Sequence, residues 1–217
     1  NSIATVSGGV VTAKSVSTQS TATITFTSTA NCTGSITVTV NPELTISGTM
    51  TATVGGSQPV LLINANTTTT ASSWSSSDQN VATVDATTAG KIVPVGPGTT
   101  TITYTDATTS CPTTAIFTVS AAPSITSTTT EVCEDGSLTL TATPSGGTWS
   151  VSAGSIASTS TTTTTSTAVF TSSNGGTTPT VTYTKGGVSD QVTVTVLAPP
   201  TISPSTAVSV CIGSDVT

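Results

Sequence analysis

Histidine is absent from this chain of 217 residues, and charged residues make up only 6% of it. Without His, neither a Ser–His–Asp nor a Cys–His catalytic arrangement can form among these residues. The basic side chains Lys14, Lys91 and Lys185 are scattered singly, and the net charge is −6, so no basic patch exists to neutralise phosphates. We therefore expect no enzyme activity, no nucleic-acid partner and no cofactor.

Good helix formers are also scarce, with one Met and three Lys or Arg residues in all. Ser and Thr fill roughly two-fifths of the chain instead, and β-branched Thr suits a pleated, half-exposed surface. A disordered, mucin-like stalk has a similar composition, but the alternation of Val, Ile and aromatic positions with Thr is typical of strands. The composition predicts an all-β protein.

No signal peptide and no apolar run long enough to span a membrane occur in the sequence. We interpret the chain as an internal stretch of a longer polypeptide.

A four-residue block recurs along the chain. Ile24–Thr27 returns as Ile102–Thr105 and again as Val181–Thr184, which places the aromatic positions 78 and then 79 residues apart. The block Ile3–Val6 likewise recurs as Val81–Val84. A fixed period of this size indicates an array of similar structural units.

Proline-marked junctions divide this array. They lie at Asn41-Pro42, Ala121-Ala122-Pro123 and Ala198-Pro199-Pro200. Short alternating segments with turn residues every 8–12 positions predict an Ig-like β-sandwich. We expect tandem Ig-like modules arranged end to end, with a C-terminal module part at 1–40, modules at 41–120 and 121–198, and an N-terminal module part at 199–217.

Each complete module has candidate core anchors. The first strand of module 41–120 is predicted to be split, and the large core residues of the two modules are predicted to be Trp74, Tyr104, Phe117, Trp149, Val181 and Tyr183. The remaining predicted strands of module 41–120 are 57–64, 72–76, 80–85, 91–95, 98–105 and 113–119. The run Thr161–Thr165 in the next module fits either a strand or an exposed loop.

The segments Trp74–Asp78, Val81–Asp85, Gly90–Val93 and Gly98–Tyr104 resemble bacterial Ig-like domains of group 2. The resemblance covers module 41–120 well, the preceding part over its surviving half, and module 121–198 only at Trp149 and its last two strands. The Thr-rich, Cys-containing repeats are also similar to giant surface adhesins of Bacteroidota, including those of the gliding-motility type. This resemblance implies export by a type IX secretion system and a filamentous role.

Acidic residues offer few candidate sites. Glu131, Glu134 and Asp135 cluster at the first turn of module 121–198, and Ca²⁺ favours such oxygen ligands. The equivalent turns of the other units lack this cluster, so solvated turn residues are the favoured interpretation, and no metal site is expected. Asp78 and Asp85 are interpreted as a turn residue and a solvated strand end.

Four cysteines fall into two equivalent pairs. Cys32 and Cys111 lie in the hairpin loop before a last strand, and Cys133 and Cys211 lie at a first turn. Val54 is taken to occupy the first-turn position of module 41–120, and module 121–198 has Lys185–Asp190 in place of a cysteine-bearing loop. Both cysteines are thus missing together at the junction that would join these two modules.

This joint absence predicts disulfides between flanking modules, since an exported protein oxidises its thiols. In a head-to-tail array a first turn faces the next module's hairpin loop, so Cys32 and Cys111 would pair backward, and Cys133 and Cys211 forward. Cys111 and Cys133 are separated by two extended strands, about 60 Å at ~3.3 Å per residue, so no bond is expected between any two of the four.

The sequence as a whole predicts a structural stalk or filament segment of a secreted, multi-repeat cell-surface adhesin. It would project a binding tip, transmit force, and contact a cell surface or extracellular substratum through other parts of the chain. The alternative is a module that binds glycan or another surface, including ice, through its loops or its regular Thr faces.

Overall fold

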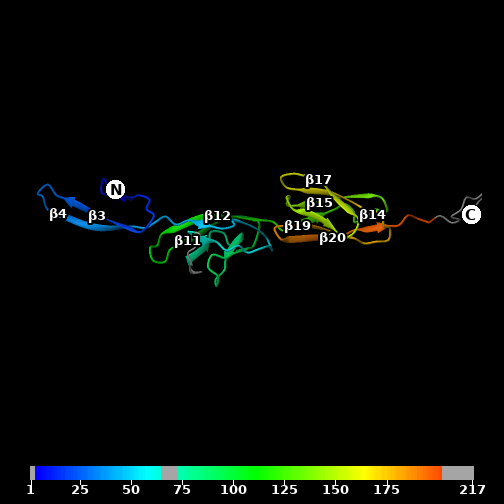
Figure 1. The fold of residues 1–217 in the computed structure, drawn as a ribbon, viewed down its shortest axis with the longest axis horizontal. Coiled ribbons are helices and arrows are strands. Elements are labelled where there is room, and N and C mark those ends of the chain that lie inside the picture. Colours follow the sequence, from blue (N-terminus) through cyan, green and yellow to red (C-terminus); the bar gives the residue numbers. More distant parts are fainter. Residues whose placement is uncertain (1–2, 65–72, 202–217) are drawn as a thin grey trace, which may run out of the picture. The chain divides into compact units, whose positions relative to one another are not determined.

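The computed structural model describes residues 3–64 and 73–201, and these residues form an all-β structure (Figure 1). The chain divides into two compact units, one of Asn1–Ala52 with Gln58–Val119 and one of Thr53–Ser57 with Ser120–Thr217. The predicted end-to-end arrangement and the module boundaries stay predictions.

The strands up to residue 120 are short except in two hairpins. They are β1 (Ala4–Ser7), β2 (Val10–Ala13), β3 (Ser20–Thr27), β4 (Thr33–Val40), β5 (Ile46–Ser47), β6 (Thr51–Thr53), β7 (Leu62–Ile63), β8 (Trp74–Ser76), β9 (Ala82–Val84), β10 (Ile92–Pro94), β11 (Gly98–Thr105) and β12 (Pro112–Ser120). The largest sheet in this region has four strands in the order β6-β12-β11-β8. The other sheets are two-stranded: β5-β7, β10-β9, β1-β2 and β3-β4. The predicted split of the first strand is confirmed by β5 and β6.

One predicted strand of this region is wrong. The expected strand over 57–64 is reduced to β7, because Pro59 has no N–H to give a ladder. The segment instead borrows its backbone partners from the turn before β10, with Leu61 N donating to Gly90 O at 2.8 Å and Ile92 N donating to Pro59 O at 2.9 Å.

The remaining strands form a sandwich of seven-strand Ig type. They are β13 (Ser124–Thr126), β14 (Glu131–Cys133), β15 (Ser137–Thr143), β16 (Thr148–Val151), β17 (Ser155–Thr161), β18 (Ser166–Thr171), β19 (Thr180–Lys185), β20 (Val188–Thr193) and β21 (Thr195–Leu197). One sheet has the order β13-β15-β18-β17 and the other β16-β19-β20, while β14 pairs with β21. The segments β13 and β14 are the two parts of a split first strand, and β21 continues the last strand after β20. Counted in this way, the sandwich has the constant-type arrangement of four strands facing three.

The core of this sandwich follows from the alternation along its strands. Val132, Leu138, Leu140, Phe170, Val181, Val194 and Val196 form one buried cluster. Trp149 packs against the cluster but is only partly buried, which corrects the expectation of a buried Trp. Its indole N–H donates to the buried hydroxyl of Ser166 at 3.1 Å.

The run Thr161–Thr165, left open by the sequence, is mostly a turn. β17 ends at Thr161 and β18 begins at Ser166. The hydroxyl of Thr162 accepts the backbone N–H of Thr165 at 2.9 Å, so a Thr side chain replaces the ladder partner that a strand would supply.

The hairpin of β3 and β4 has two unlike faces. Cα partners Thr21↔Thr39 and Thr23↔Thr37 lie on one face, and Ala22↔Val38 and Ile24↔Ile36 alternate with them on the other. Phe26 on the apolar face is 73% exposed, whereas Tyr104, its repeat equivalent on β11, is only 6% exposed. The apolar face of β3 and β4 is therefore the counterpart of a face that β11 buries.

Candidate functional site

Two short terminal strands of the sandwich run parallel. In the pairing of β14 with β21, Glu131 is the Cα partner of Thr195, Val132 of Val196 and Cys133 of Leu197. Thr195 N donates to Thr130 O at 2.8 Å before the pair, and Glu134 N donates to Leu197 O at 2.9 Å after it. One strand lies near the module's entry and the other at its exit.

This arrangement has a mechanical consequence. A pull on the two ends of the module draws β14 and β21 in opposite directions along their shared axis. Their hydrogen bonds, which are evenly spaced in a parallel pair, would then be strained together and would not open one after another. Val132 and Val196, both buried, exclude water from the middle of the pair.

The strands β6 and β12 are joined by bonds of the same kind. Thr118 N donates to Met50 O at 2.9 Å, and Val54 N donates to Ser120 O at 2.9 Å. These correspond to the bonds from Thr195 and Glu134, so the parallel terminal pair is a repeated feature of the chain. Sequence analysis predicted the split first strand but not this pairing, because a three-residue strand carries no register information of its own.

The cysteines lie at the turns that the sequence indicated. Cys32, Cys111 and Cys133 are free thiols, with Cys32 and Cys133 exposed, while Cys211 lies outside the described residues. Asn41 Nδ2 donates to Cys111 Sγ at 3.8 Å, which places the hairpin loop beside Asn41. Cys133 ends β14 opposite Leu197, beside the exit of its own module. The proposed pairing with flanking modules stays a prediction.

The acidic cluster of the first turn does not come together as a ligand set. Within residues 3–64 and 73–201, no group of three or more His, Cys, Asp or Glu side chains is placed to hold a metal ion. Asp135 has a positive φ of 61°, and its backbone N–H donates to Ser172 O at 2.9 Å. It therefore acts as a turn residue, as Asn and Asp often do in the left-handed region.

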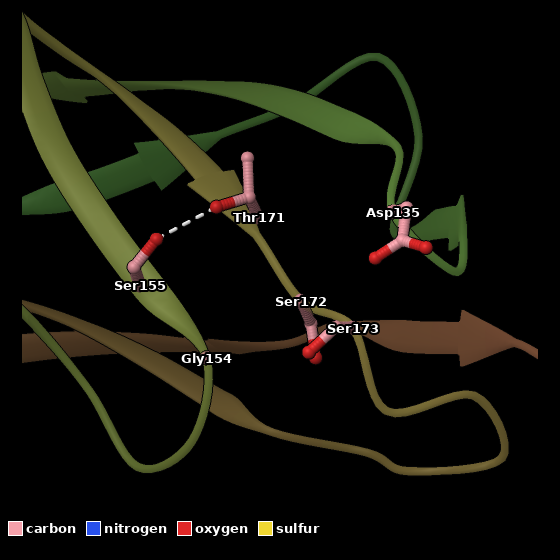
Figure 2. A pocket seen from close by; sticks show the side chains of 6 residues that line it. All are labelled: Asp135, Gly154, Ser155, Thr171, Ser172 and Ser173. Carbon is pink, nitrogen blue, oxygen red and sulfur yellow. Dashed lines mark hydrogen bonds between the residues drawn. The ribbon is translucent and has the colours of Figure 1, made fainter.

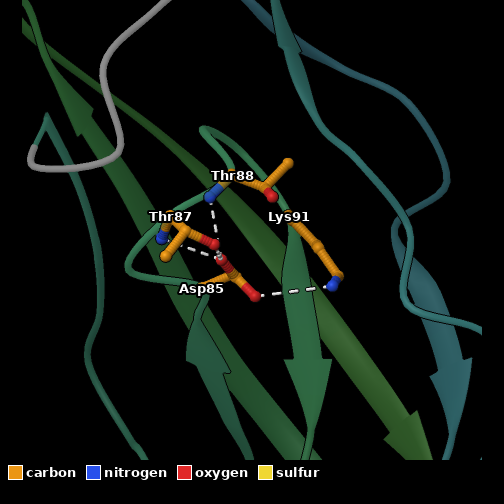
Figure 3. A network of polar contacts seen from close by, with 4 residues as sticks. All are labelled: Asp85, Thr87, Thr88 and Lys91. Carbon is orange, nitrogen blue, oxygen red and sulfur yellow. Dashed lines mark hydrogen bonds and ion pairs between the residues drawn. The ribbon is translucent and has the colours of Figure 1, made fainter.

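Asp85 directly follows β9, at the strand end that the sequence predicts, and its carboxylate also closes a turn. Its Oδ1 accepts the hydroxyl of Thr87 at 2.6 Å and the backbone N–H groups of Thr87 and Thr88 at 2.8 Å each. Oδ2 lies 3.4 Å from Lys91 Nζ, and Figure 3 shows the four residues around this carboxylate. The Thr87 hydroxyl and the two N–H groups hold the pKa of Asp85 well below its usual range.

Asp106 forms a second turn of this kind. Its Oδ1 accepts the N–H of Thr108 at 3.0 Å and both the N–H and the hydroxyl of Thr109, at 2.7 and 2.9 Å. The Thr109 bonds lower the pKa of Asp106, and the Asp106 charge adds to burial in raising the pKa of Tyr104. Both turns have the sequence Asp-Ala-Thr-Thr, a signal that sequence analysis missed.

The surface also contains a small hydroxyl-lined cavity of about 280 Å³, shown in Figure 2. Its lining residues are Asp135, Gly154, Ser155, Thr171, Ser172 and Ser173. Ser155 and Thr171 bond each other through their hydroxyls at 2.7 Å. Ligand sites combine apolar and aromatic walls with a few polar groups. This lining has no aromatic side chain, so the cavity gives the glycan-binding alternative no support.

The described part of the chain contains no helix that is long and apolar enough to cross a membrane.

No protein-family model matches the chain, and no curated protein matches it. Among solved structures, it is similar to domains 4 and 5 of the S-layer protein SbsC, with 17% identity, a TM-score of 0.30, and 72% of this chain and 98% of that chain covered. The Yersinia pseudotuberculosis adhesin InvE gives 17% identity, a TM-score of 0.30 and coverages of 70% and 58%. The titin I9–I11 tandem has 12% identity and a TM-score of 0.32, with 76% of this chain and 70% of that chain covered.

These likenesses are distant. With identities of 12–17% and TM-scores of 0.30–0.32, they specify neither a family nor an organism group. The sheet order of the sandwich and its split first strand give the fold independently of them.

Proposed function

We propose that this chain is a load-bearing segment of a secreted, multi-repeat cell-surface protein of adhesin type. Its modules would form a stalk or filament that projects a binding tip and transmits force to it. The single observation that carries the proposal is the parallel pairing of β14 with β21, a geometry in which a pull on the two ends would load the hydrogen bonds in shear.

Other features support a structural role outside the cell. The exposed surface is rich in Thr and poor in charge, which suits a repeated spacer better than a recognition surface. Partners would be a cell surface or extracellular substratum that other parts of the chain contact. Gliding motility and type IX export belong to the proposal through the sequence resemblance alone.

The test compares two variants of the sandwich under force and in denaturant. Val132→Pro removes a backbone N–H in the middle of the parallel pair, whereas Leu140→Ala makes a cavity beside the pair in the same buried cluster and leaves its backbone hydrogen bonds in place. Leu140→Ala is expected to cost about 2–5 kcal/mol of unfolding free energy. For each variant, the drop in rupture force in single-molecule pulling is divided by the loss of unfolding free energy measured in urea. If β14 and β21 bear the load, this ratio is larger for Val132→Pro than for Leu140→Ala.

The opposite ranking would overturn the proposal. If rupture force simply follows the free energy of unfolding in both variants, the terminal pair has no special mechanical role. The unpulled chain of each variant, checked by circular dichroism, serves as the folding control.

A further inference from the structure

The turn 53–57 of one module matches the first turn that contains Cys133 in the next. Gly56 N donates to Thr53 O at 2.8 Å, and Gly136 N donates to Cys133 O at 2.9 Å. Gly55 and Asp135 both have positive φ, 75° and 61°. The residue equivalent to Cys133 is therefore Thr53 and not Val54, which corrects the alignment made from the sequence.

The hairpin loops can be matched in the same way. Ser28 N donates to Cys32 O at 2.9 Å, and Asp106 N donates to Cys111 O at 3.0 Å, each at the end of the hairpin ladder. At the same place in the hairpin of β19 and β20, Lys185 is the partner of Val188. Val188 therefore occupies the position of Cys32 and Cys111.

The segments that contain these two positions meet in the second compact unit, to which both the turn Thr53–Ser57 and the β19–β20 hairpin belong. A Cβ placed on Gly186 would lie 3.0 Å from Thr53 Cβ. A Cβ placed on Gly56 would lie 3.3 Å from Val188 Cγ2 and 2.9 Å from Gly186 O. The turn and the hairpin loop thus touch, and only glycine fits at their closest approach.

We propose that this turn–hairpin contact is a repeated junction, and that a disulfide closes it wherever the two positions hold cysteine. Cys133 is the turn half of such a junction, and Cys111 and Cys32 are hairpin halves. In the contact described here, Thr53 and Val188 replace the two cysteines, and close glycine packing replaces the bond. The inference rests on the proposed tandem-module function and adds a covalent link between neighbouring modules.

The chemistry of closure is ordinary thiol oxidation. Each of two thiols loses one hydrogen, and one S–S bond forms. The two electrons and two protons pass to a disulfide oxidant such as oxidised glutathione, which leaves as two thiols. Bridged cysteines need Cβ atoms within about 3.5–4.5 Å of each other. The close approaches here join Thr53 to Gly186 and Gly56 to Val188, so each of the two positions lies against the segment that contains the other.

The experiment transplants the native pair into the contact. In a chain with C32S, C111S, C133S and C211S, the substitutions Thr53→Cys and Val188→Cys are added, and the protein is oxidised with glutathione. The matched control carries Thr53→Cys with Thr193→Cys, at the exposed far end of β20, about 16 Å from Val188 at ~3.3 Å per residue. Non-reducing peptide mapping measures the bridged fraction, and a short bismaleimide provides a second measurement of proximity.

The proposal predicts an intrachain bridge, with a loss of two hydrogens per chain, in the Thr53–Val188 pair and free thiols in the control. Failure of both oxidation and bismaleimide bridging in the Thr53–Val188 pair would overturn it, as would equal bridging in the control. Bridging is measured without any rupture force. A negative bridging result therefore overturns the junction proposal and leaves the load-bearing proposal standing, and a negative pulling result does the opposite.

Discussion

Trp74 and Tyr104 are direct Cα partners on β8 and β11, and their ring centroids lie 5.1 Å apart at an interplanar angle of 54°. Trp149 and Tyr183 repeat this relationship on β16 and β19, at 4.8 Å and 52°. The tilted geometry is one that aromatic pairs prefer. One aromatic pair therefore anchors the same strand contact in each module.

Replacing Trp74 with Ala should destabilise its own module by about 3–5 kcal/mol, because Trp74 is almost fully buried against Tyr104. Urea unfolding followed by circular dichroism measures the loss, and the fluorescence of Trp149 reports the other module separately. The exposed Ile116, changed to Ala, is the control and should shift stability by less than about 0.5 kcal/mol. A Trp149 transition that moves together with the first would contradict the independence of the modules.

Much of this anchoring was visible in the sequence. The alternation in Gly98–Thr105 and the repeat of Trp74 by Trp149 were enough to place the aromatic strands, since a half-buried strand has a period of two. The seven-strand sandwich and the split first strand also followed from turn spacing.

Other features depend on contacts between distant residues, which local patterns do not encode. The sequence suggests Val54 as the equivalent of Cys133, because no side chain in these turns marks the correct position. The backbone hydrogen bonds of the two turns show that the equivalent residue is Thr53. Trp149 likewise donates to Ser166, seventeen residues away on the other sheet, a bond that no local pattern indicates.

Tyr183→Phe should cost about 1–3 kcal/mol, because the Tyr183 hydroxyl serves two backbone groups. It accepts the N–H of Gly147 at 2.7 Å and donates to Pro144 O at 2.9 Å. Tyr104→Phe is the matched control, since its hydroxyl has no such backbone bonds among the described residues, and it should be nearly neutral. Equal losses in urea for the two variants would show that these bonds do not stabilise the turn.

Phe26→Thr should leave the stability of this chain within about 0.5 kcal/mol, because the side chain is mostly exposed. Tyr104→Thr, at the equivalent buried position, should cost about 3–5 kcal/mol, as large-to-small changes in a core do. Thermal unfolding of both variants checks the contrast. A large loss for Phe26→Thr would mean that something covers the apolar face of β3 and β4.

Acid should weaken the turns that Asp85 and Asp106 close. Hydrogen bonds to their charged forms lower both pKa values in the folded chain, so their stabilising contribution is present above the unfolded Asp pKa of about 3.9. It is lost as the pH falls below that value and through the folded pKa values.

The matched variant for this prediction is Asp85→Asn with Asp106→Asn, which keeps an acceptor oxygen but cannot titrate. Urea midpoints measured between neutral pH and strongly acid pH should fall more steeply for the native chain than for the variant. Parallel curves would show that these two carboxylates do not link folding to pH.

The most direct test of the central claim, that each module folds and bears load separately, is to pull the chain by its ends in a single-molecule force experiment. Two separate unfolding events are expected. Each should release about 230 Å of chain, from roughly 80 residues at ~3.4 Å each less the folded length. One event releasing both modules together, or extension without any rupture peak, would contradict it.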